Sequence, residues 1–174
     1  MANFLYFNVQ NGGSKSIQTK NAHIVAPILT GAHGKVKAIL QYFYQYYLFK
    51  RINDKITANL LLGIAQDKAM QVELLSQILL SCGMSPSEVI STCPINENFY
   101  KPHLLYGEEA RQIKGMLYDD VCLEVATINQ CSKKLKDLTN TKPITTIEQI
   151  IATDKTHLAR LKERINQLNY SLMF

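Results

Sequence analysis

Apolar residues recur every three or four positions over most of this chain, which is the period of amphipathic α-helices. The pattern predicts four long helices with the approximate bounds 31–52, 54–82, 108–138 and 145–168. Asn53 and Asp54 separate the first two helices, and residues 139–143 (TNTKP) separate the last two. No segment has the alternating period of β-strands, so the predicted fold class is all-α.

Two parts of the chain interrupt the helical pattern. Residues 84–106 carry Pro86, Pro94 and Pro102, so they cannot form one regular element, although the residues after Ser85 favour a short helical turn. Residues 1–28 mix polar residues with glycine and proline, and we expect an irregular N-terminal arm there.

The lengths of the connections predict the topology. A short turn within each pair of helices and one long connection between the pairs are typical of two antiparallel hairpins joined by a crossover. Helices of this length span roughly 30–45 Å, and about two dozen connecting residues can run back along them. We therefore expect a four-helix bundle over residues 29–170, preceded by the arm of residues 1–28.

Each predicted helix has an apolar stripe on one face, and each stripe contains ionisable or amide side chains. The four stripes are Lys35, Ile39, Tyr42, Tyr46 and Phe49; Ile56, Leu60, Ile64, Lys68, Gln71, Leu75 and Ile78; Ile113, Leu117, Val121, Glu124, Ile128, Cys131 and Leu135; and Ile147, Ile151, Asp154, His157, Leu161, Ile165 and Leu168. In a single helix, a slight outward rotation would explain such a polar residue equally well. Interruptions in all four helices favour a buried polar cluster, because buried charges need partners or a metal.

Composition narrows the functional classes. Of the 174 residues, 47% are apolar and 19% are charged, which is typical of an ordered globular protein. The net charge of +5 comes from scattered lysines and arginines, so we expect no nucleic-acid partner. The four cysteines have no metal-binding spacing, and no apolar run is long enough for a membrane span or a signal peptide. These features favour a cytoplasmic protein with reduced thiols and no membrane partner.

Four segments of the sequence, in this order, resemble the ferritin-like superfamily, and specifically its rubrerythrin and manganese-catalase-like branch. These segments are AILQYFYQ (38–45), IAQDKAMQVELL (64–75), LEVATINQ (123–130) and TDKTHLARL (153–161). The resemblance implies a di-iron or di-manganese site. In that site, helices one and three each supply a Glu, and helices two and four each supply a Glu-x-x-His motif.

Carried over residue by residue, the implied ligand set is half replaced. The third helix keeps its carboxylate as Glu124, and the fourth keeps a shortened pair, Asp154 and His157. Lys35 stands at the position of the glutamate of the first helix, and Lys68 and Gln71 stand at the positions of the Glu-x-x-His motif of the second.

Charge counting gives this exchange a physical meaning. Two lysines balance two carboxylates without any metal, and ammonium groups supply the hydrogen-bond donors that the carboxylates need. We therefore expect no cofactor, with Lys68 and Lys35 bridging Glu124 and Asp154. The predicted function is that of a non-catalytic binding or structural module, and the predicted assembly is a homodimer.

The alternative is an oxidoreductase with one residual metal ion. Two carboxylates and one imidazole suit iron, manganese or zinc, so Glu124, Asp154 and His157 form the candidate metal site. The tyrosine-rich segment 41–49 would lie beside that ion, but aromatic residues at helical spacing are more typical of core packing.

Overall fold

The computed structural model describes residues 15–93 and 109–171, and the chain is helical through most of both ranges. The helices are α1 (Lys15–Thr30), α2 (Lys35–Arg51), α3 (Lys55–Ser81), α4 (Pro86–Ser91), α5 (Glu109–Leu135) and α6 (Thr141–Ser171). None of the helices in these ranges is both long and apolar enough to cross a membrane. The all-α prediction is confirmed.

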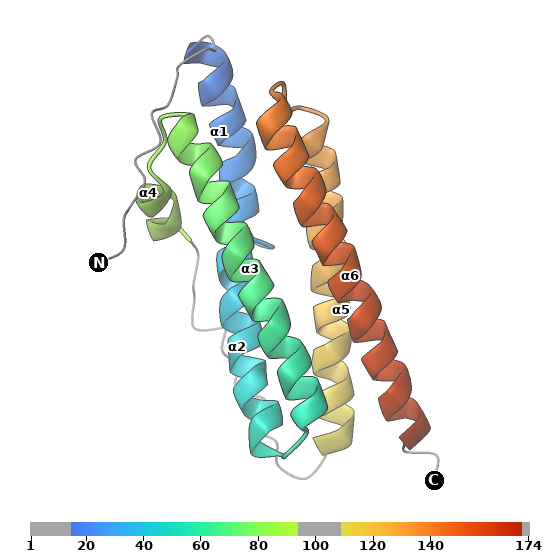
Figure 1. Ribbon diagram of the computed structural model, residues 1–174. Coiled ribbons are helices and arrows are strands. Elements are labelled where there is room, and N and C mark those ends of the chain that lie inside the picture. The colour runs from blue at the N-terminus through green and yellow to red at the C-terminus, as the bar shows by residue number, and fades with distance from the viewer. Residues whose placement is uncertain (1–14, 94–108, 172–174) are drawn as a thin grey trace, which may run out of the picture.

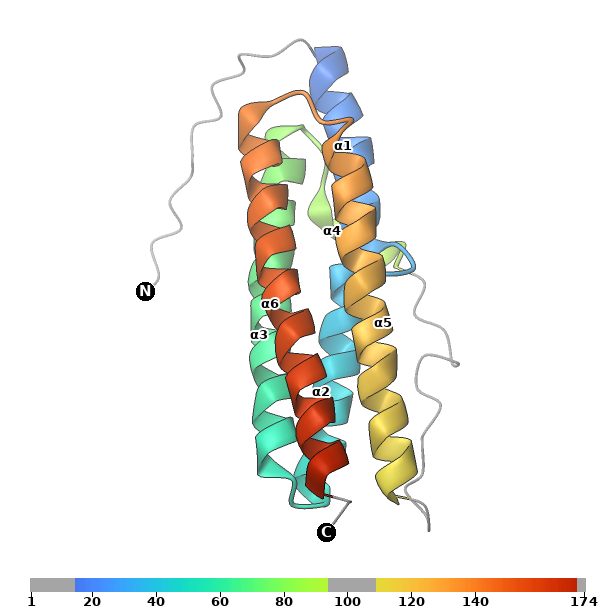
Figure 2. The same ribbon diagram turned by 90° about the vertical axis from the view of Figure 1, so that its right-hand side faces the viewer.

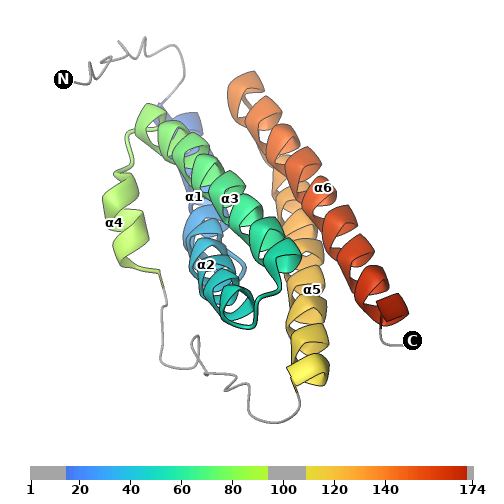
Figure 3. The same cartoon turned by 60° about the horizontal axis from the view of Figure 1, so that its bottom comes forward.

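The long helices form a bundle of two antiparallel hairpins. α1 and α2 follow one another along one column, and α3 runs back beside both of them (Figure 1). α5 and α6 form the second hairpin, which Figure 2 shows in front. The hairpins contact each other through α3 with α6 and through α1 with α5. Viewed towards the end of the bundle, the short α4 lies outside it, next to the first hairpin (Figure 3).

The helix ends follow from local sequence chemistry. Asp54 caps α3 by accepting a hydrogen bond from the Thr57 backbone N–H at 3.1 Å. Gly83 ends α3 with a φ of 74°, and the Met84 N–H reaches back to the Leu79 carbonyl at 2.9 Å. Ser85 caps α4, as the sequence predicts.

The prediction of an irregular arm is wrong for residues 15–28, since they belong to α1. Pro27 lies inside this helix, and its carbonyl accepts a hydrogen bond from the Gly31 N–H at 2.9 Å. Residues 1–14, and the part of the predicted crossover from 94 to 106, lie outside the described residues.

Two glycines separate α1 from α2 and thereby place Lys35 at the first position of α2. A Cβ on Gly31 would lie 2.5 Å from the Pro27 carbonyl oxygen, and one on Gly34 would lie 2.7 Å from the Leu29 carbonyl oxygen. Only glycine fits such close backbone approaches. The break between α1 and α2 therefore requires glycine at both positions.

The core consists of two apolar clusters with a polar layer between them. In α3 the lower cluster ends at Ala65 and the upper one begins at Leu75, with Lys68 and Gln71 between them. In α6 the same layer, formed by Asp154 and His157, separates Ile147–Ile151 from Leu161–Ile165. The polar residues of the helical stripes are thus buried midway along the bundle.

The predicted stripes differ from the buried faces at several points. In α2, Ala38 and Gln45 are buried, whereas the predicted Ile39 and Tyr46 are only partly buried. Ile56 is exposed, at 66%, whereas Thr57 and Ala58 in the same turn of α3 are buried, so the buried face of this helix begins one residue later than predicted. In α5, Asp120 is fully buried at the turn where the prediction places Val121, and Val121 itself is only partly buried. The side chain of Ile113 lies outside the described residues.

Candidate functional site

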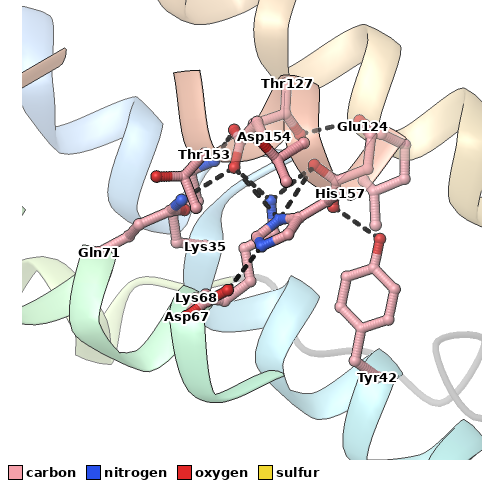
Figure 4. A network of polar contacts seen from close by, with 12 residues as sticks. Lys35, Tyr42, Asp67, Lys68, Gln71, Glu124, Thr127, Thr153, Asp154 and His157 are labelled. Carbon is pink, nitrogen blue, oxygen red and sulfur yellow. Dashed lines mark hydrogen bonds and ion pairs between the residues drawn. The ribbon is translucent and has the colours of Figure 1, made fainter. Parts of the chain in front are cut away.

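The structure brings the six residues singled out by the sequence into one cluster, seen from close by in Figure 4. Each of them is at most 3% exposed. They are Lys35 from α2, Lys68 and Gln71 from α3, Glu124 from α5, and Asp154 and His157 from α6. All four of these helices therefore contribute to the same buried volume.

Lys68 is the centre of the cluster. Its Nζ donates to Glu124 Oε2 at 2.7 Å and to Asp154 Oδ1 at 2.6 Å. Burial disfavours the charged ammonium, but the two carboxylates outweigh burial and raise the pKa of Lys68. Lys68 is therefore a cation that links α5 to α6.

Asp154 receives three donors. Lys35 Nζ donates to its Oδ2, while Lys68 Nζ and Gln71 Nε2 donate to its Oδ1, the latter at 2.9 Å. Burial alone would raise the pKa of Asp154, but Lys35 and Lys68 lower it below the usual value. Burial, together with the charge of Lys68, lowers the pKa of Lys35. Asp154 is thus stabilised as a carboxylate. Of the two lysines, Lys35 holds its proton less tightly than Lys68 does.

Glu124 is shared between a lysine and a tyrosine. Its second oxygen, Oε1, accepts from the Tyr42 hydroxyl at 2.7 Å. Burial of the phenol, reinforced by neighbouring carboxylates, raises the pKa of Tyr42 well above its ordinary value. Tyr42 therefore acts in the cluster as a neutral hydrogen-bond donor.

His157 connects the cluster to the protein surface. Its Nε2 lies 2.9 Å from Asp67 Oδ2, and the side chain of Asp67 is 41% exposed. A carboxylate can only accept, so Nε2 carries a hydrogen. Nδ1 has no hydrogen-bond partner among the described residues and lies 3.9 Å from Glu124 Oε2 and 3.8 Å from Asp154 Oδ1.

Glu124, Asp154 and His157 also form a group with the composition of a metal site. One ligand atom from each of them lies within 4.8 Å of the other two. The carboxylate oxygens that face His157 Nδ1 are the same two that accept from Lys68. A metal ion and the Lys68 ammonium would therefore compete for the same two oxygens.

Comparison with known proteins shows a similarity of fold. No protein-family model matches the chain, and no curated protein matches it. Among solved structures, the bacterioferritin of Desulfovibrio desulfuricans superposes with a TM-score of 0.73 at 18% sequence identity, covering 91% of this chain and 85% of that one. The chain has a ferritin-like fold. The bacterioferritin structure records a diiron site in different catalytic states.

The polar cluster also has hydrogen-bond partners that the sequence pattern does not identify. The pattern places Tyr42 in the core packing, and it leaves Asp67 off the apolar stripe because Asp67 precedes the stripe residue Lys68. Both become partners of the cluster through contacts between helices, which the period of a single helix does not reveal.

Asp120 is a further buried carboxylate that the predicted stripe of α5 leaves out. It is 0% exposed, and its Oδ1 accepts from Gln41 Nε2 at 2.7 Å and from Gln45 Nε2 at 3.0 Å. Its position four residues before Glu124 places it on the same face of α5. That spacing is the signal that could have found it.

Proposed function

We propose that this protein is a ferritin-like bundle that has lost its di-metal centre and works as a non-catalytic binding or structural module. The resemblance in sequence suggests the rubrerythrin and manganese-catalase-like branch as its origin. In this proposal, a network of two lysines and two carboxylates takes the place of two metal ions.

The contacts of Lys68 carry the proposal. Its Nζ lies within 2.7 Å of one oxygen of Glu124 and one oxygen of Asp154. An ammonium at that position repels a dication and already satisfies the oxygens that would bind one. Lys35 and Gln71 supply further hydrogen-bond donors, whereas metal ligands supply lone pairs.

The charge balance of the cluster supports the same conclusion. Lys35 and Lys68 contribute two positive charges, and Glu124 and Asp154 contribute two negative charges. The four ions sum to zero. Adding a dication would leave an excess of buried positive charge unless a lysine lost its proton.

Metal analysis of the protein, purified without chelator from cells grown with added iron, manganese and zinc, tests the proposal. We expect substoichiometric metal of every kind. One tightly held metal ion per chain, lost when Glu124 is changed to Gln, would overturn it.

A second candidate function, an oxidoreductase with one iron, manganese or zinc ion, is favoured by the geometry of His157. Metal-bound histidines donate their other ring N–H to a carboxylate, as His157 does to Asp67. Its Nδ1 faces the oxygens of Glu124 and Asp154 and is available as a ligand when the imidazole is neutral. In this candidate these three residues would hold the ion, and such an ion supplies redox or Lewis-acid chemistry when bound.

The variant Lys68→Met separates the two candidates. Under the first proposal, the wild type does not take up a divalent ion in calorimetric titrations, and the variant does, because the competing ammonium is gone. Under the second, the wild type binds and the variant gains little. The double variant Lys68→Met/His157→Ala is the matched control for ligation by these residues.

We also propose that the protein forms a homodimer. Tyr118, Cys122 and Val125 are exposed and follow one another at helical spacing on the outer face of α5. Light scattering coupled to size exclusion should give twice the 19.7 kDa of one chain, and Tyr118→Lys should reduce that mass. A monomeric wild type would contradict this proposal.

A further inference from the structure

Asp120 and Gln45 form a buried polar pair outside the lysine–carboxylate cluster. Asp120 is 0% exposed and Gln45 is 5% exposed. Gln45 Nε2 donates to Asp120 Oδ1 at 3.0 Å, which joins α2 to α5. Gln41, one turn earlier on α2, donates to the same oxygen at 2.7 Å.

The remaining oxygen of each group has no donor among the described residues. Asp120 Oδ2 and Gln45 Oε1 are both buried, and neither has a hydrogen-bond partner there. Both atoms are acceptors when Asp120 is ionised, so the pair is one hydrogen short. Leaving two buried acceptors unsatisfied is costly, and a single hydrogen between them removes both deficits.

The charged groups around Asp120 do not supply a cation. On α5 its neighbours are Glu124 and the exposed Asp119, and on α2 it interacts electrostatically with Tyr42, which donates to Glu124. Lys68 of α3 is committed to Glu124 and to Asp154 of α6. Among the side chains that the structure describes, no lysine, arginine or histidine forms an ion pair with Asp120.

We propose that Asp120 and Gln45 form a proton-binding site, in which a proton on Asp120 Oδ2 is donated to Gln45 Oε1. With the bond from Gln45 Nε2 to Asp120 Oδ1, this completes the ring of two hydrogen bonds that a carboxylic acid forms with a primary amide. No group is covalently changed, and the proton comes from solvent. None of the three candidate metal ligands, Glu124, Asp154 and His157, belongs to this site.

The electrostatics agree with this geometry. Burial raises the pKa of Asp120 to about 7, against the lowering effect of the Gln41 and Gln45 hydrogen bonds, and Glu124 and Asp119 raise it further. The folded pKa then lies above the unfolded value near 3.8, so folding takes up a proton between these two pH values. Stability attributable to Asp120 is therefore greatest below the unfolded pKa and falls until the pH passes the folded value.

The experiment is a pH titration of the wild-type protein with 13C-labelled aspartate, followed by NMR at the Asp120 carboxyl carbon. The resonance is assigned by its loss in Asp120→Asn. We expect a midpoint near neutral pH for Asp120 that falls only slightly in Asp119→Asn, because the charge of this exposed neighbour is the smallest of the causes that raise the Asp120 pKa. A midpoint in the ordinary acidic range would overturn the proposal.

Two further measurements keep the test decisive. Asp120→Asn mimics the protonated acid, because its amide can donate to Gln45, so its melting temperature should change less between about pH 5 and 8 than that of the wild type. If this variant does not fold, the resonance is assigned from backbone connectivities and the titration still decides. A midpoint that shifts when potassium replaces sodium would assign the site to a monovalent cation and overturn the proton site.

Discussion

The Lys68 ammonium lies 2.6 Å from Asp154 Oδ1, and this contact joins the two hairpins of the bundle at the middle of its core. Both side chains are essentially inaccessible to solvent. A buried pair of this kind is not itself evidence of high stability, because removing the charges from water is costly. Removing only one of the two partners is strongly destabilising, because the other charge is then buried without compensation. The first prediction tests this.

Changing Lys68 to Met should destabilise the protein by about 3–5 kcal/mol, because it leaves two buried carboxylates short of a cation. Chemical denaturation followed by circular dichroism measures the loss. The exposed Lys155, beside Asp154 on α6, is the matched control, and Lys155→Met should change little. Adding Glu124→Gln to Lys68→Met should recover part of the loss, and equal stability of Lys68→Met and the parent would exclude a buried bridge.

Acid should remove the contribution of Asp154. Its folded pKa is lower than its unfolded value, so the stability it provides is complete above the unfolded pKa of about 3.8 and is lost as the pH falls through the folded one. The free energy of unfolding should therefore decline steeply below about pH 4. Glu148→Gln, on the exposed side of the same helix, should keep this slope, whereas Asp154→Asn should weaken it.

The glycines between α1 and α2 give a prediction about the backbone. Gly34→Ala would place a Cβ 2.7 Å from the Leu29 carbonyl oxygen, and we expect a loss of about 1–3 kcal/mol from the resulting strain. A Cβ on Gly63, inside α3, would meet no neighbouring atom within 4 Å, so Gly63→Ala should stabilise by roughly 0.5–1 kcal/mol. Thermal unfolding of both variants tests the pair, and the same sign for both would contradict it.

Arg164 fixes the end of α6 to the turn between α2 and α3. It donates to both oxygens of Asp54 at 2.9 Å and, through Nε, to Thr57 Oγ1 at 2.7 Å. Because Asp54 also caps α3, Asp54→Ala should cost about 1–2 kcal/mol. Arg164→Ala should cost less on its own, and the two losses should not add in a double-mutant cycle; additive losses would contradict the coupling.

The sequence is sufficient to predict the main helices and the direction of the polar residues, because helical period reports which face of a helix is buried. Asp154 and His157 interrupt an apolar stripe, and the structure buries them. Period does not report partners on other helices, so it does not predict the roles of Tyr42 and Asp67. Asp120 escapes prediction because the stripe of α5 is placed one residue too far along, at Val121.

The missed helix α1 has a different cause. Pro27 and the glycines of residues 31–34 are typical of irregular chain, and they do end a helix here, but only after four turns have formed. The packing of α1 against α3 and α5, which local propensity does not include, compensates for the proline.

The distribution of the cluster over the chain has a consequence for assembly. The first hairpin supplies both lysines, Lys35 and Lys68, and the second supplies both carboxylates, Glu124 and Asp154. Either hairpin alone, or two copies of the same hairpin packed together, would bury like charges without compensation. The charges of each hairpin are therefore complementary to those of the other hairpin and not to its own. If two chains exchange hairpins, a first hairpin can pack stably only against a second one.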